Sequence, residues 1–81
     1  MRVVLYGRPG CHLCDEAREQ LLAMRGAAGG FELREIDIES DDALLISHLE
    51  RIPVVEVDGR VVSELELDAG RVQRALVPAS G

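Results

Sequence analysis

The sequence predicts one α/β domain with a four-stranded mixed sheet and the element order β-α-β-α-β-β-α. Three observations lead to this class. The chain has 81 residues, a length that leaves no room for a second hydrophobic core. Apolar positions alternate between a period of two and a helical period, and an Asp-Gly pair separates two apolar runs in the second half. We therefore expect residues 1–81 to form a single domain with an ordered core of about 2–77.

The first two elements are a buried strand and a helix. Residues 3–6 are a short apolar run, and turn-forming residues follow at 7–10. From Cys11 onward apolar residues recur at helical spacing, with acidic residues in the first turn and Gly26 after the last apolar position. These features predict a helix over about residues 11–25.

A second strand and a second helix follow a flexible, glycine-rich connection at residues 26–30. Residues 31–38 return to a period of two, which predicts a strand. Crossovers between such strands are right-handed, so the first two strands are expected to lie parallel, with the helix across one face. Ser40 is the expected N-cap of a short helix over about residues 41–50.

The second half of the chain predicts a hairpin and a last helix. Residues 53–57 and 60–63 flank Asp58-Gly59, which supplies the positive φ angles of a two-residue turn. The last two strands are therefore expected to be antiparallel neighbours. Asp68 starts a terminal helix that ends near Val77, and residues 78–81 are interpreted as a frayed end.

Charge and hydropathy exclude two classes of partner. The net charge is −6, and only Tyr6 and Phe31 offer aromatic rings for stacking on bases, so we expect no nucleic-acid binding. No apolar run approaches the ~18 residues of a membrane span, and no leader pattern follows Met1, so we expect a cytoplasmic protein with no membrane contact. The acidic stretch at 32–42 is interpreted as a solvated strand end and helix start, in preference to a docking surface.

Cys11 and Cys14 stand where the first strand passes into the first helix. A helix N-terminus presents unpaired N–H groups and the positive end of the dipole, which favours the thiolate of Cys11. Cys14 lies one turn further on the same side and is expected to be more buried, suited to attack a mixed disulfide on Cys11. Arg8 adds positive charge nearby, and His12 does so when protonated. A bridge across so short a loop contributes little to stability, and cytoplasmic thiols are kept reduced, so the pair indicates chemistry or metal binding.

Two other interpretations of the cysteine pair stay open. Zinc usually takes four protein ligands, and the chain has no second cysteine pair; its two histidines are His12, between the cysteines, and the distant His48. The pair is alternatively two inert, buried small residues. Reversible thiol–disulfide chemistry accounts best for the spacing and the position at a helix start.

The sequence around these cysteines resembles the thioredoxin superfamily, most closely the glutaredoxins and a small bacterial glutaredoxin-like family. The resemblance covers about residues 2–77 and rests on residues 5–14, the Ile52-Pro53 step and residues 57–60. It implies a thioredoxin fold in which Pro53 is cis beside the active cysteines and the backbone of Ile52 pairs with the substrate chain. From the residues alone, an ordinary trans proline at the first position of a strand is the alternative.

Several positions depart from glutaredoxins. That family commonly has Cys-Pro-Tyr-Cys, a lysine near Arg8, a threonine where this chain has Arg51, and Gly-Gly with a following Asp after the hairpin. Here the intervening pair is His12-Leu13, Ser63-Glu64 stands at the two glycines, and Glu66 at the Asp. By resemblance, the two arginines would face glutathione carboxylates and Glu66 its ammonium group, although solvated surface charges explain them equally well. Losing the glycines removes a close backbone approach.

Thioredoxins differ from this chain in two ways. They usually carry a tryptophan before the cysteine pair and a buried Asp six residues before the first cysteine. The chain has no tryptophan and has Leu5 at that offset, so it lacks that carboxylate as a proton acceptor for Cys14. Tyr6, the next residue, is expected to be a core residue or a pocket wall.

These observations predict a glutaredoxin-like thiol–disulfide oxidoreductase in which Cys11 attacks a disulfide and Cys14 resolves it. The expected substrate-binding residues are Arg8, His12, Arg51, Ile52, Pro53 and Glu66. We expect a monomer that needs no metal or cofactor and acts on a disulfide-containing protein or on glutathione as co-substrate. Two rival hypotheses are a non-catalytic module that senses redox state or shares an iron–sulfur cluster through Cys11 between two chains, and a redox-inert interaction domain.

Overall fold

The computed structural model describes residues 1–27 and 30–76. The elements are, in order, β1 (Arg2–Gly7), α1 (His12–Ala27), β2 (Glu32–Asp37), the 3₁₀ helix η1 (Ile38–Ser40), α2 (Asp42–His48), β3 (Val54–Val57), β4 (Arg60–Ser63) and α3 (Ala69–Leu76). The predicted α/β class and the element order β-α-β-α-β-β-α are confirmed, with η1 as an addition between β2 and α2.

The four strands form one mixed sheet in the order β2-β1-β3-β4. β1 and β2 are parallel, and β3 is antiparallel to both β1 and β4, as expected for the first and last strand pairs. Asp58 and Gly59 have φ angles of 49° and 85°, the left-handed conformation that a two-residue hairpin turn requires. Because β1 lies between β2 and β3, its carboxyl end is central in the sheet.

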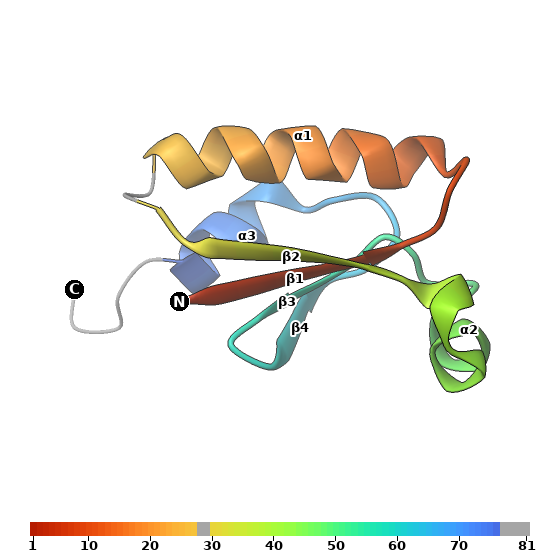
Figure 1. The fold of residues 1–81 in the computed structure, drawn as a ribbon. Helices are drawn as coiled ribbons and strands as arrows, with labels where there is room; N and C mark the ends of the chain where they lie inside the picture. Colours follow the sequence, from red (N-terminus) through yellow and green to blue (C-terminus); the bar gives the residue numbers. More distant parts are fainter. Residues whose placement is uncertain (28–29, 77–81) are drawn as a thin grey trace.

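The hydrophobic core lies between the sheet and two helices on one face. Figure 1 shows α1 running along this face with α3 beside it, while α2 lies on the opposite side near the carboxyl end of β2. The buried core residues are Val3, Leu5, Ala17, Leu21, Met24, Val55, Val57, Val72 and Leu76. Odd-numbered residues of β1 therefore face α1, and this parity places Gly7 under the start of that helix.

Two helix ends differ from the prediction. α1 continues through Ala27 and includes Gly26, which was expected just past its end. The glycine at the helix end is Gly30, which has a φ of 98° and donates its N–H to the carbonyl of Arg25 at 2.9 Å. α2 ends at His48, two residues before the predicted end. Residues 28–29 of the expected flexible connection lie outside the described residues, as do Val77 and the expected frayed end at 78–81.

The start of α2 is also different, because Asp41 and not Ser40 is its N-cap. The Asp41 side chain accepts the N–H of Ala43 at 2.8 Å. Ser40 belongs to η1, and its hydroxyl donates to the carbonyl of Asp37 at 2.6 Å. This turn ends β2 at Asp37, one residue before the predicted end, and buries Ile38. β3 begins at Val54, one residue after Pro53.

Candidate active site

Cys11 occupies the N-cap position of α1, at the end of a tight turn that leaves β1. In this turn the N–H of Cys11 donates a hydrogen bond to the carbonyl of Arg8 at 3.3 Å. Gly10, within the turn, has a φ of 80°. The carbonyl of Cys11 accepts the N–H of Asp15 at 3.1 Å, and its Sγ accepts the N–H of Cys14 at 3.1 Å. The Cys11 sulfur therefore takes the place of the side-chain oxygen that usually caps a helix, as the sequence position predicts.

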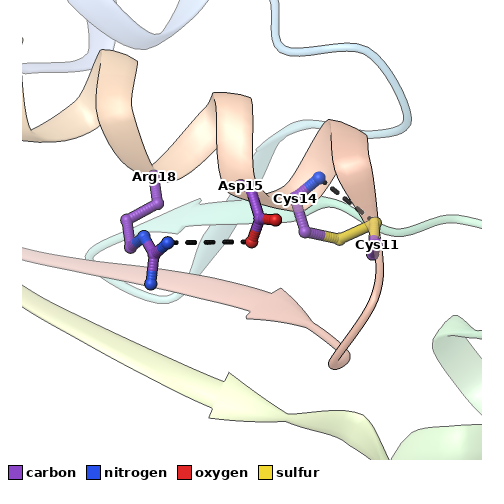
Figure 2. The surroundings of a disulfide bond; sticks show 4 residues. All are labelled: Cys11, Cys14, Asp15 and Arg18. Atoms are coloured by element: carbon purple, nitrogen blue, oxygen red, sulfur yellow. Dashed lines mark hydrogen bonds and ion pairs between the residues drawn. A yellow bond between two sulfur atoms is a disulfide. The ribbon is translucent and has the colours of Figure 1, made fainter.

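Cys11 and Cys14 are joined by a disulfide, with their Cα atoms 5.2 Å apart. Figure 2 shows the bridge at the start of α1, with Asp15 and Arg18 following along the same helix. Cys11 is partly exposed, whereas Cys14 is 6% exposed, in agreement with the predicted difference between them. A disulfide partner can thus reach Cys11, while Cys14 is shielded from it.

Gly7 makes room for this arrangement; the sequence predicted it as the first residue of the turn, whereas the structure has it as the last residue of β1. A Cβ atom on Gly7 would lie 3.0 Å from Sγ and 3.1 Å from Cβ of Cys14, tighter than nine in ten real Cβ contacts. Gly7 does not have a positive φ, so close packing, and not backbone conformation, favours a glycine here. The end of β1 is therefore in direct contact with the side chain of Cys14.

Arg8 and His12 flank the bridge, and both have carboxylate neighbours. Arg8 Nη2 lies 3.4 Å from Glu39 Oε2. His12 Nε2 lies 3.4 Å from Glu16 Oε1, and the His12 side chain is 86% exposed. Exposed pairs of this kind contribute little energy, so the backbone N–H groups at the start of α1 are the main source of positive potential at the Cys11 sulfur.

The Ile52-Pro53 peptide bond is cis, as the resemblance implied, and the alternative of an ordinary trans proline is wrong. Pro53 is fully buried and Ile52 is half-buried. The N–H groups of Arg51 and Ile52 both donate to the carbonyl of His48, at 2.8 and 3.1 Å. The N–H of Leu65 donates to the carbonyl of Arg51 at 2.8 Å, which ties this segment to the β4–α3 loop.

The remaining expected binding residues lie in and beside that loop. Arg51 Nε is 3.7 Å from Glu64 Oε2, and Glu66 is exposed. Figure 1 shows the start of α1, the segment before β3 and the β4–α3 loop at the same end of the sheet. The fold thus gathers the predicted residues at one end, while its ion pairs join Arg8 and Arg51 to Glu39 and Glu64, two partners that the sequence did not indicate.

A cavity of about 280 Å³ lies on the other side of Cys14, between β1, β2 and α1. Its charged lining residues are Arg8, Asp15, Arg18, Glu35 and Asp37. Arg18 lies 3.7 Å from Asp15 and 3.6 Å from Glu35, and so connects α1 to β2. Glu35 and Asp37 are both exposed, as expected for the solvated acidic stretch, and their spacing of two residues on a strand puts both on the face toward α1.

Tyr6 lies on the opposite face of the sheet, where it contacts α2 and β3. Its hydroxyl donates to Glu56 Oε1 at 3.3 Å, and its ring centroid lies 4.7 Å from that of His48. Burial and the neighbouring Glu56 carboxylate raise the pKa of Tyr6 above its usual 10.0. Tyr6 is therefore part of a polar cluster under α2, and it faces away from the side that carries Cys14.

Within residues 1–27 and 30–76, no group of three or more His, Cys, Asp or Glu side chains is arranged to hold a metal ion. In the same part of the chain, no helix has both the length and the apolar character needed to cross a membrane.

A four-stranded sheet, a cysteine pair at the start of α1 and a cis-proline before β3 define a thioredoxin-fold protein of the glutaredoxin-like kind. Residues 2–77 match the family described as "Glutaredoxin-like domain (DUF836)". The chain belongs to this family.

Relatives agree with this assignment. Uncharacterized protein Rv0508 of Mycobacterium tuberculosis is 32% identical over 77 residues, covering 89% of this chain and 78% of its own. The solution structure of protein Ne2328 from Nitrosomonas europaea has a TM-score of 0.82 and 29% identity, covering 94% of this chain and 91% of that one. The X-ray structure of protein XcR50 from X. campestris has a TM-score of 0.74 and 33% identity, covering 94% of this chain and 99% of that one.

A more distant solved structure supports the fold alone. Thioredoxin 1 from Thermosipho africanus has a TM-score of 0.61 at 12% identity, with 94% of each chain covered. The thioredoxin fold implied by the sequence resemblance is confirmed.

Proposed function

We propose that this protein is a thiol–disulfide oxidoreductase whose reacting groups are Cys11 and Cys14. One observation carries the proposal: two cysteines within one helical turn form a disulfide, with a partly exposed first sulfur and a buried second one. A short bridge at a helix N-terminus opens and closes without moving the rest of the fold. That property separates a redox-active pair from a structural bridge, which closes a longer loop.

In the proposed reaction, the Cys11 thiolate attacks one sulfur of a substrate disulfide. A Cys11–substrate bond forms, the substrate S–S bond breaks, and one substrate thiolate leaves. Cys14 loses its proton and attacks the Cys11 sulfur, which releases the second substrate thiolate and forms the Cys11–Cys14 bridge. The substrate disulfide is reduced to two thiols, and the two cysteines are oxidised. The hydrogen bond that the Cys14 N–H donates to the Cys11 sulfur stabilises negative charge on that sulfur in the reduced state.

We propose Arg8, His12, Arg51, Ile52, Pro53 and Glu66 as the surface that receives the substrate, a disulfide-containing protein or a glutathione mixed disulfide. In the ion pairs of Arg8 with Glu39 and of Arg51 with Glu64, both partner side chains are exposed to solvent. Exposed pairs contribute only about 0–1 kcal/mol, so an incoming carboxylate exchanges with them at little cost. A reducing compartment, the cytoplasm, keeps the dithiol form available.

Reduction of insulin by dithiothreitol tests the proposal. Wild-type protein is expected to accelerate the reaction, and Cys11→Ser to reduce the rate to that without protein, because the attacking sulfur is gone. Cys14→Ser is the matched variant: it retains the first attack, so it accumulates a mixed disulfide with substrate. Equal rates for wild type and Cys11→Ser would contradict the proposed function.

A further inference from the structure

The cavity behind Cys14 joins the resolving cysteine to a set of charged side chains that the proposed reaction does not yet use. Of the two cysteines, Cys14 lines it, together with Gly7 and Asp37. At about 280 Å³ it is large enough for several water molecules, and its polar lining can hold them. Cys14 thus lines a space that carboxylate side chains also line.

Cys14 needs a proton acceptor before it can attack. Its side chain is 6% exposed, and burial disfavours a thiolate. The backbone N–H of Cys14 donates to the sulfur of Cys11, as the dashed line in Figure 2 marks. It therefore does not stabilise a thiolate on Cys14 itself. A group that accepts this proton must lie within hydrogen-bond reach, directly or through one water molecule.

The register of β1 and β2 places Asp37 next to the glycine under Cys14. Asp37 pairs with Gly7 in this parallel pair, and neighbouring strands lie about 4.8 Å apart. The sulfur of Cys14 lies 3.0 Å from the position of a Cβ on Gly7, so it fills the space above that glycine. The backbone of Asp37 is therefore one strand spacing from the glycine that this sulfur covers, with its side chain on the same face, an arrangement that a single bridging water molecule can span.

The other charges of the cavity are engaged with one another. Arg18 pairs with both Asp15 and Glu35, at 3.7 and 3.6 Å. Glu35 also pairs in register with Leu5, one pleat further from Cys14 than Asp37. Asp15 and Glu35 thus already have a cationic partner, whereas Asp37 has no ion pair among the described residues.

Asp37 itself is held by the backbone. Its Oδ1 accepts the N–H of Glu39 at 2.8 Å. Arg8, the remaining cation that lines the cavity, pairs with Glu39 at 3.4 Å. This hydrogen bond holds the Asp37 carboxylate at the end of β2 through one oxygen and leaves the second oxygen free to accept from a water molecule in the cavity.

We propose that Asp37 is the proton acceptor for Cys14 in the resolving step, an assignment that rests on the proposed function. The Cys14 thiol gives its proton to the Asp37 carboxylate through one water molecule. The Cys14 thiolate attacks Cys11, the bond between Cys11 and the substrate sulfur breaks, and the substrate leaves as a thiolate. Asp37 then returns the proton to solvent. Arg18 acts as a positioning residue that holds Asp15 and Glu35 at the wall of the cavity.

Stopped-flow reaction of the reduced protein with 5,5′-dithiobis(2-nitrobenzoate) separates the two steps. Attack by Cys11 releases one coloured thiolate, and resolution by Cys14 releases a second. Asp37→Asn is expected to slow the second release at least about tenfold at pH 6, since a positioned base contributes ~10²–10⁴-fold, and to leave the first unchanged. At pH 9.5 hydroxide is abundant enough to take the Cys14 proton directly, so the difference between the variant and wild type is expected to narrow.

The variants include matched controls. An Asn side chain retains the acceptor for the Glu39 N–H, so Asp37→Asn preserves the turn, and Asp37→Glu is expected to restore part of the lost rate at pH 6. Glu35→Gln, on the same strand and in the same cavity, is expected to change the second release less than about twofold.

Three results would overturn the assignment: an unchanged second release in Asp37→Asn, the same slowing at pH 6 and pH 9.5, or an equal loss in Glu35→Gln. Failure of the proposed function looks different, because the first release would then be missing or insensitive to Cys11→Ser.

Discussion

The contact between Gly7 and the side chain of Cys14 gives the first prediction at the scale of single residues. Gly7→Ala is expected to destabilise the oxidised protein by about 1–3 kcal/mol, because the new methyl group lies 3.0 Å from a sulfur that the disulfide holds in place. Urea unfolding of the oxidised protein measures this change. Gly26→Ala is the matched control: its methyl meets nothing within 4 Å in α1, so it is expected to stabilise by about 0.5–1 kcal/mol. Equal effects of the two variants would contradict the account.

Tyr6 gives a second prediction at this scale. Burial and the Glu56 carboxylate raise its pKa, so the folded protein keeps the phenol proton in a range above pH 10.0 where the unfolded chain has lost it. The stabilisation from the neutral phenol is therefore complete below pH 10 and is lost as the pH rises through the folded pKa. The rise in absorbance at 295 nm, which follows ionisation of the phenol, is expected at higher pH in the folded protein than in a model tyrosine. In Glu56→Gln it is expected at lower pH than in wild type. Coincident curves for wild type and Glu56→Gln would contradict this.

Residue roles that depend on local sequence were predictable, and roles that depend on register were not. Cys11 and Cys14 stand three apart at a strand–helix junction, so their bridge and their unequal burial follow from the sequence. Asp37 lies next to the Cys14 site only because Gly7 and Asp37 pair across two strands. A single sequence does not carry that register, because shifting a strand by one residue reverses which side chains face α1.

At the scale of elements, the cap of α2 gives a third prediction. Asp41→Ala is expected to cost about 1 kcal/mol of unfolding free energy, because the N–H of Ala43 loses its side-chain acceptor. Ser40→Ala, which removes an exposed hydrogen bond to the carbonyl of Asp37, is the matched control and is expected to cost less. Urea unfolding midpoints of both variants measure the difference. A larger loss for Ser40→Ala would restore Ser40 as the cap that the sequence favoured.

Element types were predictable from periodicity, whereas several ends were not. The Asp58-Gly59 turn was predicted correctly because its conformation depends on those two residues alone. The end of α1 was misplaced at Gly26, since two later glycines compete and Gly30 makes the closing bond to Arg25. Acidic residues at 37, 39, 41 and 42 all offer caps, so the sequence alone did not separate η1 from α2.

At the scale of the whole molecule, the bridge is expected to contribute little to stability. Closing a loop as short as Cys11–Cys14 removes chain entropy worth about 2 kcal/mol from the unfolded state. Reduction is therefore expected to lower the unfolding free energy by about 2 kcal/mol or less and to leave the protein folded. Circular dichroism during thermal unfolding, with and without reductant, measures this. Unfolding on reduction at room temperature would show that the bridge is structural.

The global fold was predictable because its determinants lie along the whole sequence. Strand–helix–strand order, hairpin and chain length together leave few arrangements, and the resemblance over residues 2–77 selected one of them. The cis state of Pro53 came from that resemblance, because local sequence favours trans. The ion pairs of Arg8 and Arg51 with Glu39 and Glu64 depend on loops brought together by the complete fold.

The central claim is that Cys11 attacks and Cys14 resolves. Mass spectrometry after equilibration with a glutathione redox buffer tests it most directly on wild type, Cys11→Ser and Cys14→Ser. We expect an internal bridge in wild type, a stable glutathione adduct on Cys11 in Cys14→Ser, and little adduct in Cys11→Ser, because Cys14 is buried. An adduct on Cys14 as abundant as that on Cys11, or a wild type that forms neither bridge nor adduct, would contradict it.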